Sequence, residues 1–410
     1  MTPTQDTSSD TGGGGGRSLT LADLLSQAER HPDVVAATTD VDSARGGITA
    51  ADRAPLPQIT ASVASIDLQN GLGAGSLAGS KRIDKGVGVD WTWERGNKRE
   101  HRVRSAEFAL EAARYERLEA LVQRRLAIAA AYWDLLAAQE RETVARESAN
   151  SAAQTAAVSK TRFEKGDISE QELSRLSIEA ERARNELAAV SASREIAAIT
   201  LAQAAGIKAG DLRAGGTWSS SASSLSRPTP GATQAAQMRF DVKAAQSRLM
   251  AARASLDLAR SLQTTDITWG GGFNNYPPEQ RAAVQVRAQF PWQINYQFEG
   301  EIRQAAAAVQ RSEEMLRLTT QLAISDMLAL DLKKDRSAER LALFETQIRA
   351  QARQVLQRAE AAYNRGATPL TDLLEARRTH LAVELDAVQA RADASRAATE
   401  WVLRLEGIAK

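Results

Sequence analysis

Apolar positions along this chain repeat with two different periods, and the changes of period predict its elements. A spacing of three to four residues is typical of a helix with one buried face, and a spacing of two is typical of a strand. Prolines at 55 and 57 and glycines at 96 and 166 separate the segments. The elements expected in the first half are a helix over residues 19–54, strands over about 58–69 and 82–94 with a glycine-rich turn at 71–80, and helices over 97–165 and 169–205.

The same order returns about 200 residues later, so the sequence is a duplication. Phe163–Ile168 returns as Tyr363–Thr368, and Asp33-Val34 returns as Asp241-Val242. The elements expected in the second half are a helix over 233–262, strands over about 265–275 and 281–293 around Pro277-Pro278, a helix over 298–364 and a last helix to 406. A repeat of this length indicates a half-protein that was duplicated and fused, not a short solenoid motif.

The repeats divide the chain into four segments. Residues 1–18 are polar, include a run of glycines, and are expected to be disordered; they lack the apolar stretch of a secretory signal. Residues 19–207 form the first repeat and 233–410 the second. Between them, residues 208–232 are rich in Ser, Gly and Pro, which is typical of a surface connector.

Composition narrows the class of protein. Few aromatic residues (5%) among many Ala, Arg, Glu and Leu residues are typical of long helices and coiled coils. A net charge of +1 gives no support to nucleic-acid binding, and the lack of Cys excludes disulfides and thiolate metal sites. His31, His101 and His380 lack ligand spacing, so no metal site or cofactor is expected. No nucleophile motif or phosphate loop appears, so we expect no enzymatic activity.

The strand segments carry apolar residues on one face and polar residues on the other. Asp90, Gln285, Arg287 and Gln289 fall on the polar face. This alternation is typical of a membrane barrel, although a half-buried soluble hairpin packed on helices fits the pattern equally well. Four of the seven Trp residues lie in these segments, where they suit a membrane interface: Trp91, Trp93, Trp269 and Trp292. Four strands leave open edges, so a membrane barrel would require several chains, either two or three.

Together these features resemble the TolC-like outer membrane factor family, from about Leu19 to Glu406. The resemblance rests on the duplicated order of elements and on the sequences of Tyr363–Arg377 and Ala54–Ile59. The amino-acid sequence as a whole is most similar to the heavy-metal cation-efflux branch. The resemblance implies a mainly α protein with a membrane β-barrel. Each chain of a homotrimer would give four strands to a twelve-stranded barrel in the outer membrane of a Gram-negative bacterium, and a long α-barrel would extend into the periplasm.

The resemblance also implies a function. The chain would be the passive exit duct of a tripartite efflux pump, driven by an inner-membrane resistance–nodulation–division exporter through a periplasmic adaptor protein, with heavy-metal cations as cargo. The alternatives are an exit duct for drugs or type I secreted proteins, and a soluble coiled-coil adaptor protein. Neither a signal sequence nor an N-terminal Cys for lipid attachment is seen in this chain.

Two sets of site residues follow from the resemblance. The periplasmic gate would contain Tyr363 with Asp372 and Glu375, two carboxylates three residues apart on one helix face; a solvated helix surface is the alternative. Thr368 stands where a relative has Arg, so the closing network is not expected to be complete. The docking tips for the adaptor would be formed by Lys165, Gly166, Asp167, Arg365 and Gly366.

Overall fold

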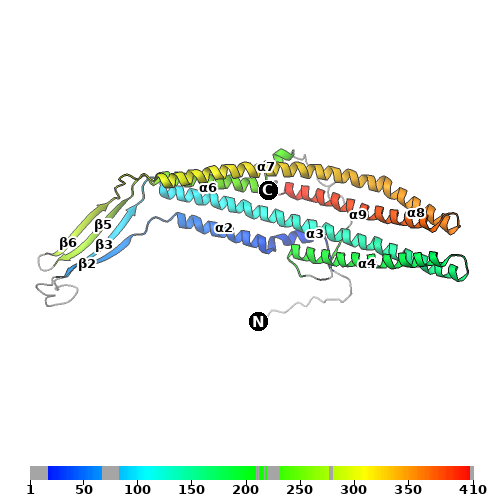
Figure 1. The fold of residues 1–410 in the computed structure, drawn as a ribbon. Helices are drawn as coiled ribbons and strands as arrows, with labels where there is room; N and C mark the ends of the chain where they lie inside the picture. Colours follow the sequence, from blue (N-terminus) through cyan, green and yellow to red (C-terminus); the bar gives the residue numbers. More distant parts are fainter. Residues whose placement is uncertain are drawn as a thin grey trace, which may run out of the picture. The chain divides into compact units, whose positions relative to one another are not determined.

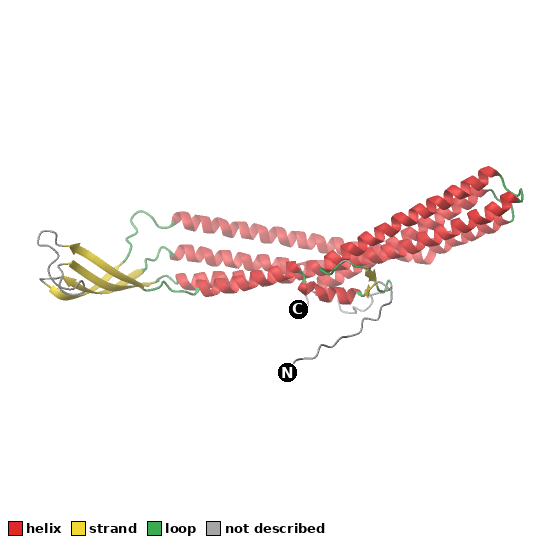
Figure 2. Cartoon of the chain, turned by 90° about the horizontal axis from the view of Figure 1, so that it is seen from below, coloured by secondary structure: helices red, strands yellow, loops and turns green. Residues whose placement is uncertain are grey.

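The computed structural model describes residues 17–66, 83–208, 231–276 and 280–406, together with 210, 212–216 and 218. Helices dominate this part of the chain, and its strands form one four-stranded and one two-stranded sheet (Figure 2). The expected turns at 71–80 and at Pro277-Pro278 lie outside the described residues. None of the described helices combines the length and the apolar run needed to cross a membrane.

The first half follows the predicted order, with one additional break. Its elements are α1 (Leu21–Gln27), α2 (Pro32–Ala51), β2 (Gln58–Ile66), β3 (Ile83–Trp93), α3 (Lys98–Glu164) and α4 (Glu170–Ala205) (Figure 1). The single helix expected over residues 19–54 is wrong, because a 3-10 turn at Ala28–Arg30 and an extended His31 separate α1 from α2. Pro32 explains the break, since a residue that precedes proline is disfavoured in the helical conformation.

The second half repeats this order and this break. Its elements are α5 (Ala232–Gln237), α6 (Phe240–Ser261), β5 (Ile267–Tyr276), β6 (Gln280–Gln289), α7 (Glu299–Leu343), a π-helical segment (Phe344–Ile348), α8 (Arg349–Asn364) and α9 (Leu370–Glu406). The break between α5 and α6 and the π-helical segment were not predicted. The strand expected to reach residue 293 ends at Gln289, because Pro291 has no N–H to donate to a ladder.

The described chain divides into two compact units, each built from both repeats. The strand unit consists of Ala37–Arg117 and Phe240–Leu322, and the turn unit consists of Met1–Ala36, Leu118–Arg239 and Ala323–Lys410. The division into two sequence repeats therefore describes the order of elements along the chain, whereas each unit combines matching parts of both copies.

The strand unit contains an antiparallel sheet with the order β2-β3-β5-β6. The β3–β5 pair joins the two repeats, and β2 and β6 lie at the edges. Two ion pairs connect the strand ends to the helix that follows β3: Lys98 to Asp266 at 2.7 Å and Arg102 to Glu94 at 2.6 Å. Gly96 occupies the left-handed region (φ 72°) at this strand-to-helix turn, where a residue with a Cβ would be strained.

The turn unit contains a small parallel sheet that the sequence did not predict. β1 (Arg17–Leu19) pairs with β4 (Leu212–Ala214), so Arg17 and Ser18 lie in a strand and the connector contributes its partner strand. Residues 1–16 of the segment expected to be disordered lie outside the described residues. The Gln139 side chain fixes this sheet to α3, since its amide accepts from the Ala214 N–H (2.8 Å) and donates to the Ala214 carbonyl (3.2 Å).

Leucines, alanines and a few aromatic residues, Trp133 among them, form the core of the turn unit. The Trp133 indole is buried, donates to the Thr399 hydroxyl at 3.1 Å and stacks on Trp218 with 5.9 Å between ring centres. Alanine is the most frequent residue type among the buried residues of α9 (Ala376, Ala387, Ala390, Ala392 and Ala397). Small side chains let helices approach closely, which explains how so few aromatic residues suffice for this core.

Candidate functional site: the paired turns and the two-faced sheet

The two glycine-centred turns of the turn unit have the same backbone structure. Gly166 and Gly366 both lie in the left-handed region, with φ of 80° and 71°. In each turn the glycine N–H donates three residues back and the next N–H donates five residues back, all at 2.9 Å. This pattern ends a helix by pairing its last carbonyls, and glycine adopts the required φ without steric cost. The two turns lie side by side at one end of the turn unit (Figures 1 and 2).

One hydrogen bond joins the two turns. The Tyr363 hydroxyl at the end of α8 donates to Oε1 of Glu172 in the first turn of α4, at 2.6 Å. A negatively charged side chain is favoured in the first turn of a helix, where it faces unpaired N–H groups. The apolar part of the contact is a buried cluster of Tyr363 with three leucines: Leu176, Leu370 and Leu373. The bond therefore links the two repeats through a largely dehydrated side chain.

The surroundings of Tyr363 hold its phenol in the neutral form. Only 7% of Tyr363 is exposed, and the Arg162 guanidinium lies 5.7 Å from its ring centre. Burial, followed by the hydrogen bond and the charge of Glu172, raises the pKa of Tyr363 to about 12, against the opposing effect of Arg162. The phenol is therefore a hydrogen-bond donor throughout the physiological pH range.

The predicted gate residues do not form one cluster. Tyr363 is bound to Glu172, whereas Asp372 and Glu375 are exposed on the first turns of α9. The buried positions of this helix segment are Leu373, which follows Asp372, and Ala376, which follows Glu375. The acidic pair thus shares one exposed helix face, as the spacing predicts.

Glu172 is the residue that the sequence analysis missed. The repeat contains a signal for it, because Glu172 and Asp372 occupy the same position six residues after their glycines. Tyr363 likewise corresponds to Phe163, which has no hydroxyl. Of the two hydrogen bonds that an aromatic residue before the glycine could make to the acidic residue of the other copy, only the one from Tyr363 to Glu172 can therefore form, and Asp372 on α9 has no such partner.

The predicted docking tips all lie on the surface of the turns. Lys165, Gly166, Asp167, Arg365 and Gly366 are exposed. A Cβ placed on either glycine would meet nothing within 4 Å, so the space beside both turns is open. A partner could approach this surface without displacing any part of the chain that the structure describes.

The four-stranded sheet has one apolar face, and that face is exposed. Val284 and Val286 on β6 are 81% and 77% exposed, and Ile59 on β2 is 80% exposed. Trp91 lies directly opposite Trp269 on the neighbouring strand. The other exposed apolar residues of this face are Val63, Val87, Val89, Trp93 and Phe273. So large an apolar surface is unusual for a monomer in water and indicates contact with protein or lipid.

Trp292 differs from the other three tryptophans of the predicted interface. It follows Pro291, beyond the end of β6, and 83% of it is exposed. Trp91, Trp93 and Trp269 lie within strands and are about half exposed. Three of the four therefore share the apolar face of the sheet, and Trp292 lies on the segment that leads to α7.

The histidines do not form a ligand set with one another or with the acidic residues. Within the described ranges, no three His, Asp or Glu side chains gather into a group that could hold a metal ion. The turns and the sheet offer surfaces and a hydrogen bond between the repeats, with no described cluster suited to coordinating a cofactor.

Long helices, duplicated turns and a two-faced sheet with open edges define the class: a duplicated helical protein with one strand pair per repeat. The model of the outer membrane efflux protein family matches residues 24–207 and 232–401. The chain therefore belongs to the outer membrane efflux protein family, which confirms the resemblance drawn from the sequence. No curated protein sequence matches the chain.

Solved structures share the fold at low sequence identity. CusC is 18% identical and matches with a TM-score of 0.80, over 94% of this chain and 91% of CusC. The outer membrane protein VceC of Vibrio cholerae is 19% identical, with a TM-score of 0.75 over 95% of each chain. The MtrE outer membrane channel of Neisseria gonorrhoeae is 18% identical, with a TM-score of 0.75 over 94% of this chain and 88% of MtrE. The mainly helical fold with one four-stranded sheet per chain is thus confirmed.

Proposed function

We propose that this protein is the passive outer membrane duct of a tripartite efflux pump and that it works as a homotrimer. The observation that carries the proposal is the exposed apolar face of a sheet whose edge strands, β2 and β6, are unpaired along their outer sides in the described chain. Lipid does not tolerate open strand edges, so the sheet must close with other copies. Three chains with four strands each would make a twelve-stranded barrel, with the apolar face toward lipid and the polar face toward water.

The turn unit suits the periplasmic entrance of such a duct. In this proposal Tyr363, bound to Glu172, holds the two helix pairs of one chain together, while Asp372 and Glu375 face the axis and form acidic rings in the trimer. Rings of carboxylates attract cations and repel anions. Opening would require the α8–α9 pair to separate from α4, with the Tyr363–Glu172 bond as one contact to break.

The exposed turns suit the docking of a partner. We place a periplasmic adaptor protein on Lys165, Asp167 and Arg365, which surround the two open glycine positions. The energy for transport would come from an inner-membrane exporter of the resistance–nodulation–division class, since no described part of the chain offers a nucleotide site. The alternative of a soluble adaptor is set aside, because the chain belongs to the outer membrane efflux protein family.

For the cargo, we favour heavy-metal cations over drugs or type I secreted proteins. The acidic residues at the proposed entrance favour positively charged cargo. The amino-acid sequence of the chain is also most similar to the cation-efflux branch of the family. A deletion strain separates these cargoes: loss of resistance to metal salts with unchanged resistance to dyes and detergents supports cations. The reverse pattern would point to drugs.

The assembly is tested by native mass spectrometry of the protein extracted in detergent. We expect a trimer, and release of the protein from membranes only when detergent is present. A stable folded monomer or dimer, or release by a salt wash alone, contradicts the proposal.

The docking of the adaptor is tested by charge reversal at the turns (Lys165→Glu with Arg365→Glu), which should abolish efflux and leave the trimer intact. The matched control is Arg184→Glu on the exposed surface of α4, which should leave efflux unchanged.

A further inference from the structure

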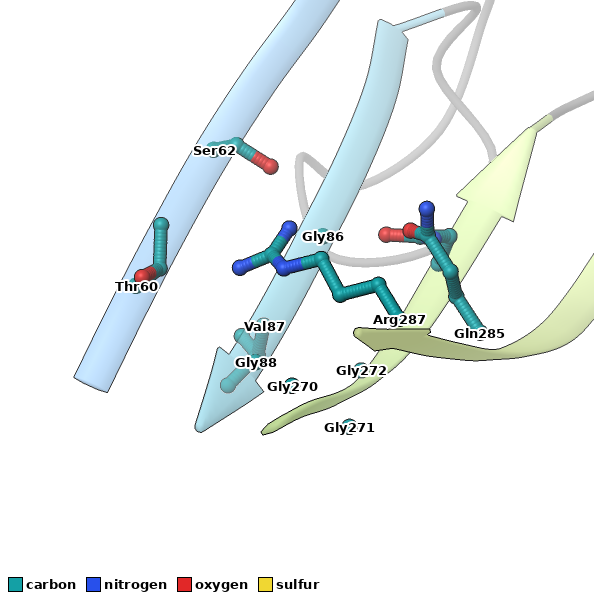
Figure 3. Close-up of a pocket in the computed structure, with 11 residues that line it drawn as sticks. Thr60, Ser62, Gly86, Val87, Gly88, Gly270, Gly271, Gly272, Gln285 and Arg287 are labelled. Carbon is teal, nitrogen blue, oxygen red and sulfur yellow. The ribbon is translucent and has the colours of Figure 1, made fainter. Parts of the chain in front are cut away.

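The polar face of the four-stranded sheet carries a charge pair that spans three strands. Asp90 on β3, Gly270 on β5 and Arg287 on β6 lie in one row of the sheet register. The Arg287 guanidinium passes over the middle strand and binds Asp90 at two points, with Nη2 to Oδ2 at 2.5 Å and Nε to Oδ1 at 3.0 Å. Figure 3 shows this side chain extending across the glycines toward Thr60 and Ser62. Thr60 on β2 donates to the same carboxylate at 3.1 Å, so the contact involves all four strands.

Gly270 makes this contact possible by its lack of a side chain. A Cβ at this position would lie 2.4 Å from Oδ1 of Asp90 and 2.6 Å from Nε of Arg287, inside the space that the pair occupies. The backbone of Gly270 is outside the left-handed region, so no unusual φ requires glycine there. The neighbouring Gly271 points to the other face, where a Cβ would meet nothing within 4 Å.

The rows on either side of the pair carry no charge. One holds Thr60, Gly88, Gly272 and Gln285, the next holds Ser62, Gly86, Asn274 and Ala283, and the row toward the helices holds Thr92, Thr268 and Gln289. Together with the row of the pair itself these make four rows of the polar face. The charged side chains in these four rows are Asp90 and Arg287, and they are bound to each other. An uncompensated charge at this level would be repeated in every copy of the chain.

We propose that Asp90 and Arg287 form a self-compensated pair that prevents this level of the duct from selecting ions by the sign of their charge, and that Gly270 is the residue that permits it. The inference rests on the proposed function, in which the polar face lines a water-filled lumen. Rings of like charge in a pore set its ion selectivity. Here each carboxylate is matched within its own chain, so closure of the barrel creates no ring of one sign.

The absence of Cys from the chain allows a local test. Ser62→Cys introduces a single thiol on the polar face, two rows from the pair, where Ser62 and Arg287 line one small cavity. Its reaction rates with a cationic and an anionic methanethiosulfonate reagent report the local potential in the detergent-extracted trimer. In this background Asp90→Asn should change the ratio of the two rates about two- to fivefold in favour of the anionic reagent. Arg287→Gln should change it by a similar factor in the opposite direction, and the double variant should restore the original ratio.

Two outcomes overturn the inference in different ways. If the thiol introduced by Ser62→Cys reacts but neither single variant moves the ratio, the charge-pair proposal is wrong and the duct proposal stands. If the thiol reacts with neither reagent, the polar face is not lined by water, and both proposals fail. Ile59→Cys on the apolar face is the control position, where lipid or detergent should cover the thiol and both charged reagents should react much more slowly than at position 62.

The role of Gly270 is tested by a matched pair of glycine variants. Gly270→Ala should lower the Tm of the trimer, and adding Asp90→Asn to it should lower the Tm little further, because both changes remove the same contact. Gly271→Ala should leave the full effect of Asp90→Asn. Additive effects of Gly270→Ala and Asp90→Asn would show that the glycine does not act through the pair.

Discussion

The two glycine-centred turns have the same backbone but different chemistry. Both have a left-handed glycine, the same two hydrogen bonds and an acidic residue six positions later, Glu172 in the first copy and Asp372 in the second. The aromatic residue before each glycine differs: Tyr363 is buried and bound, whereas Phe163 is 39% exposed. The duplicated backbone was thus retained while its side chains took on separate roles.

This difference shows how a duplicated chain can place one fixed and one exposed carboxylate at the same end of a unit. The hydroxyl of Tyr363 engages the acidic residue of the first repeat. For the acidic residue of the second repeat, the sequence counterpart of the tyrosine is Phe163, and a phenyl ring has no hydroxyl to donate. Asp372 is exposed to solvent. Substitutions that exchange the chemistry of the two copies test this account.

The largest effect is expected from the leucines that follow the turns. Leu373→Ala should destabilise the paired turns by about 2–5 kcal/mol, because Leu373 is fully buried against Tyr363, Leu176 and Leu370. Its counterpart Leu173 is only partly buried, so Leu173→Ala should cost about 1 kcal/mol. Amide hydrogen exchange at the start of α9 measures the loss. Equal loss of protection in the two variants would contradict the asymmetry of the turns.

A smaller effect is expected from the hydroxyl itself. Tyr363→Phe should weaken the contact between the turns by about 1–3 kcal/mol, since it removes a hydrogen bond to a charged group. The reciprocal change, Phe163→Tyr, should alter stability by no more than about 0.5 kcal/mol, because the ring is on the surface. Exchange protection at the first turn of α4 distinguishes the two. A larger loss of exchange protection from Phe163→Tyr than from Tyr363→Phe would contradict the conclusion that position 363 makes the contact between the turns and position 163 does not.

Periodicity and repetition were sufficient to predict most of the fold. The alternation of β3 and β6 gave the two faces of the sheet, and the repeated glycines gave the turns. The β1–β4 pairing was missed because three-residue strands carry no periodic signal, and their partners are about 195 residues apart. The π-helical segment at Phe344–Ile348 was missed because its sequence continues the helical period.

The candidate site was predicted only in part, for a related reason. The resemblance places Tyr363 in a gate with Asp372 and Glu375, which belong to the same repeat. The actual partner of Tyr363, Glu172, lies in the other repeat, 191 residues away. Contacts across a duplication depend on how the two copies pack, which local spacing does not contain. Aligning the copies position by position would have identified Glu172 as a candidate.

The third prediction concerns the ionisation of Tyr363. Its pKa is raised from the ordinary 10 to about 12, because burial and Glu172 favour the neutral phenol. The stabilisation that this phenol contributes is therefore fully present below pH 10 and is lost as the pH rises from 10 toward 12. The difference in tyrosinate absorbance between the wild type and Tyr363→Phe should show a midpoint near pH 12. Glu172→Gln should lower that midpoint, and a wild-type midpoint near pH 10 would exclude the buried hydrogen bond.

The smallest effect on stability, and the most specific one on function, is expected from the exposed carboxylates. Replacing Asp372 with Asn and Glu375 with Gln should change stability by no more than about 0.5 kcal/mol, because both side chains lie on the surface. If they form the proposed rings, the double variant should show weaker cation selectivity and weaker block by multivalent cations in planar bilayers. Glu172→Gln is the matched control, since it removes a carboxylate that is bound to Tyr363, and it should leave selectivity near the wild-type value. Wild-type selectivity and block in the Asp372 and Glu375 variant would place these carboxylates on an outer surface, and the constriction would then have to lie elsewhere.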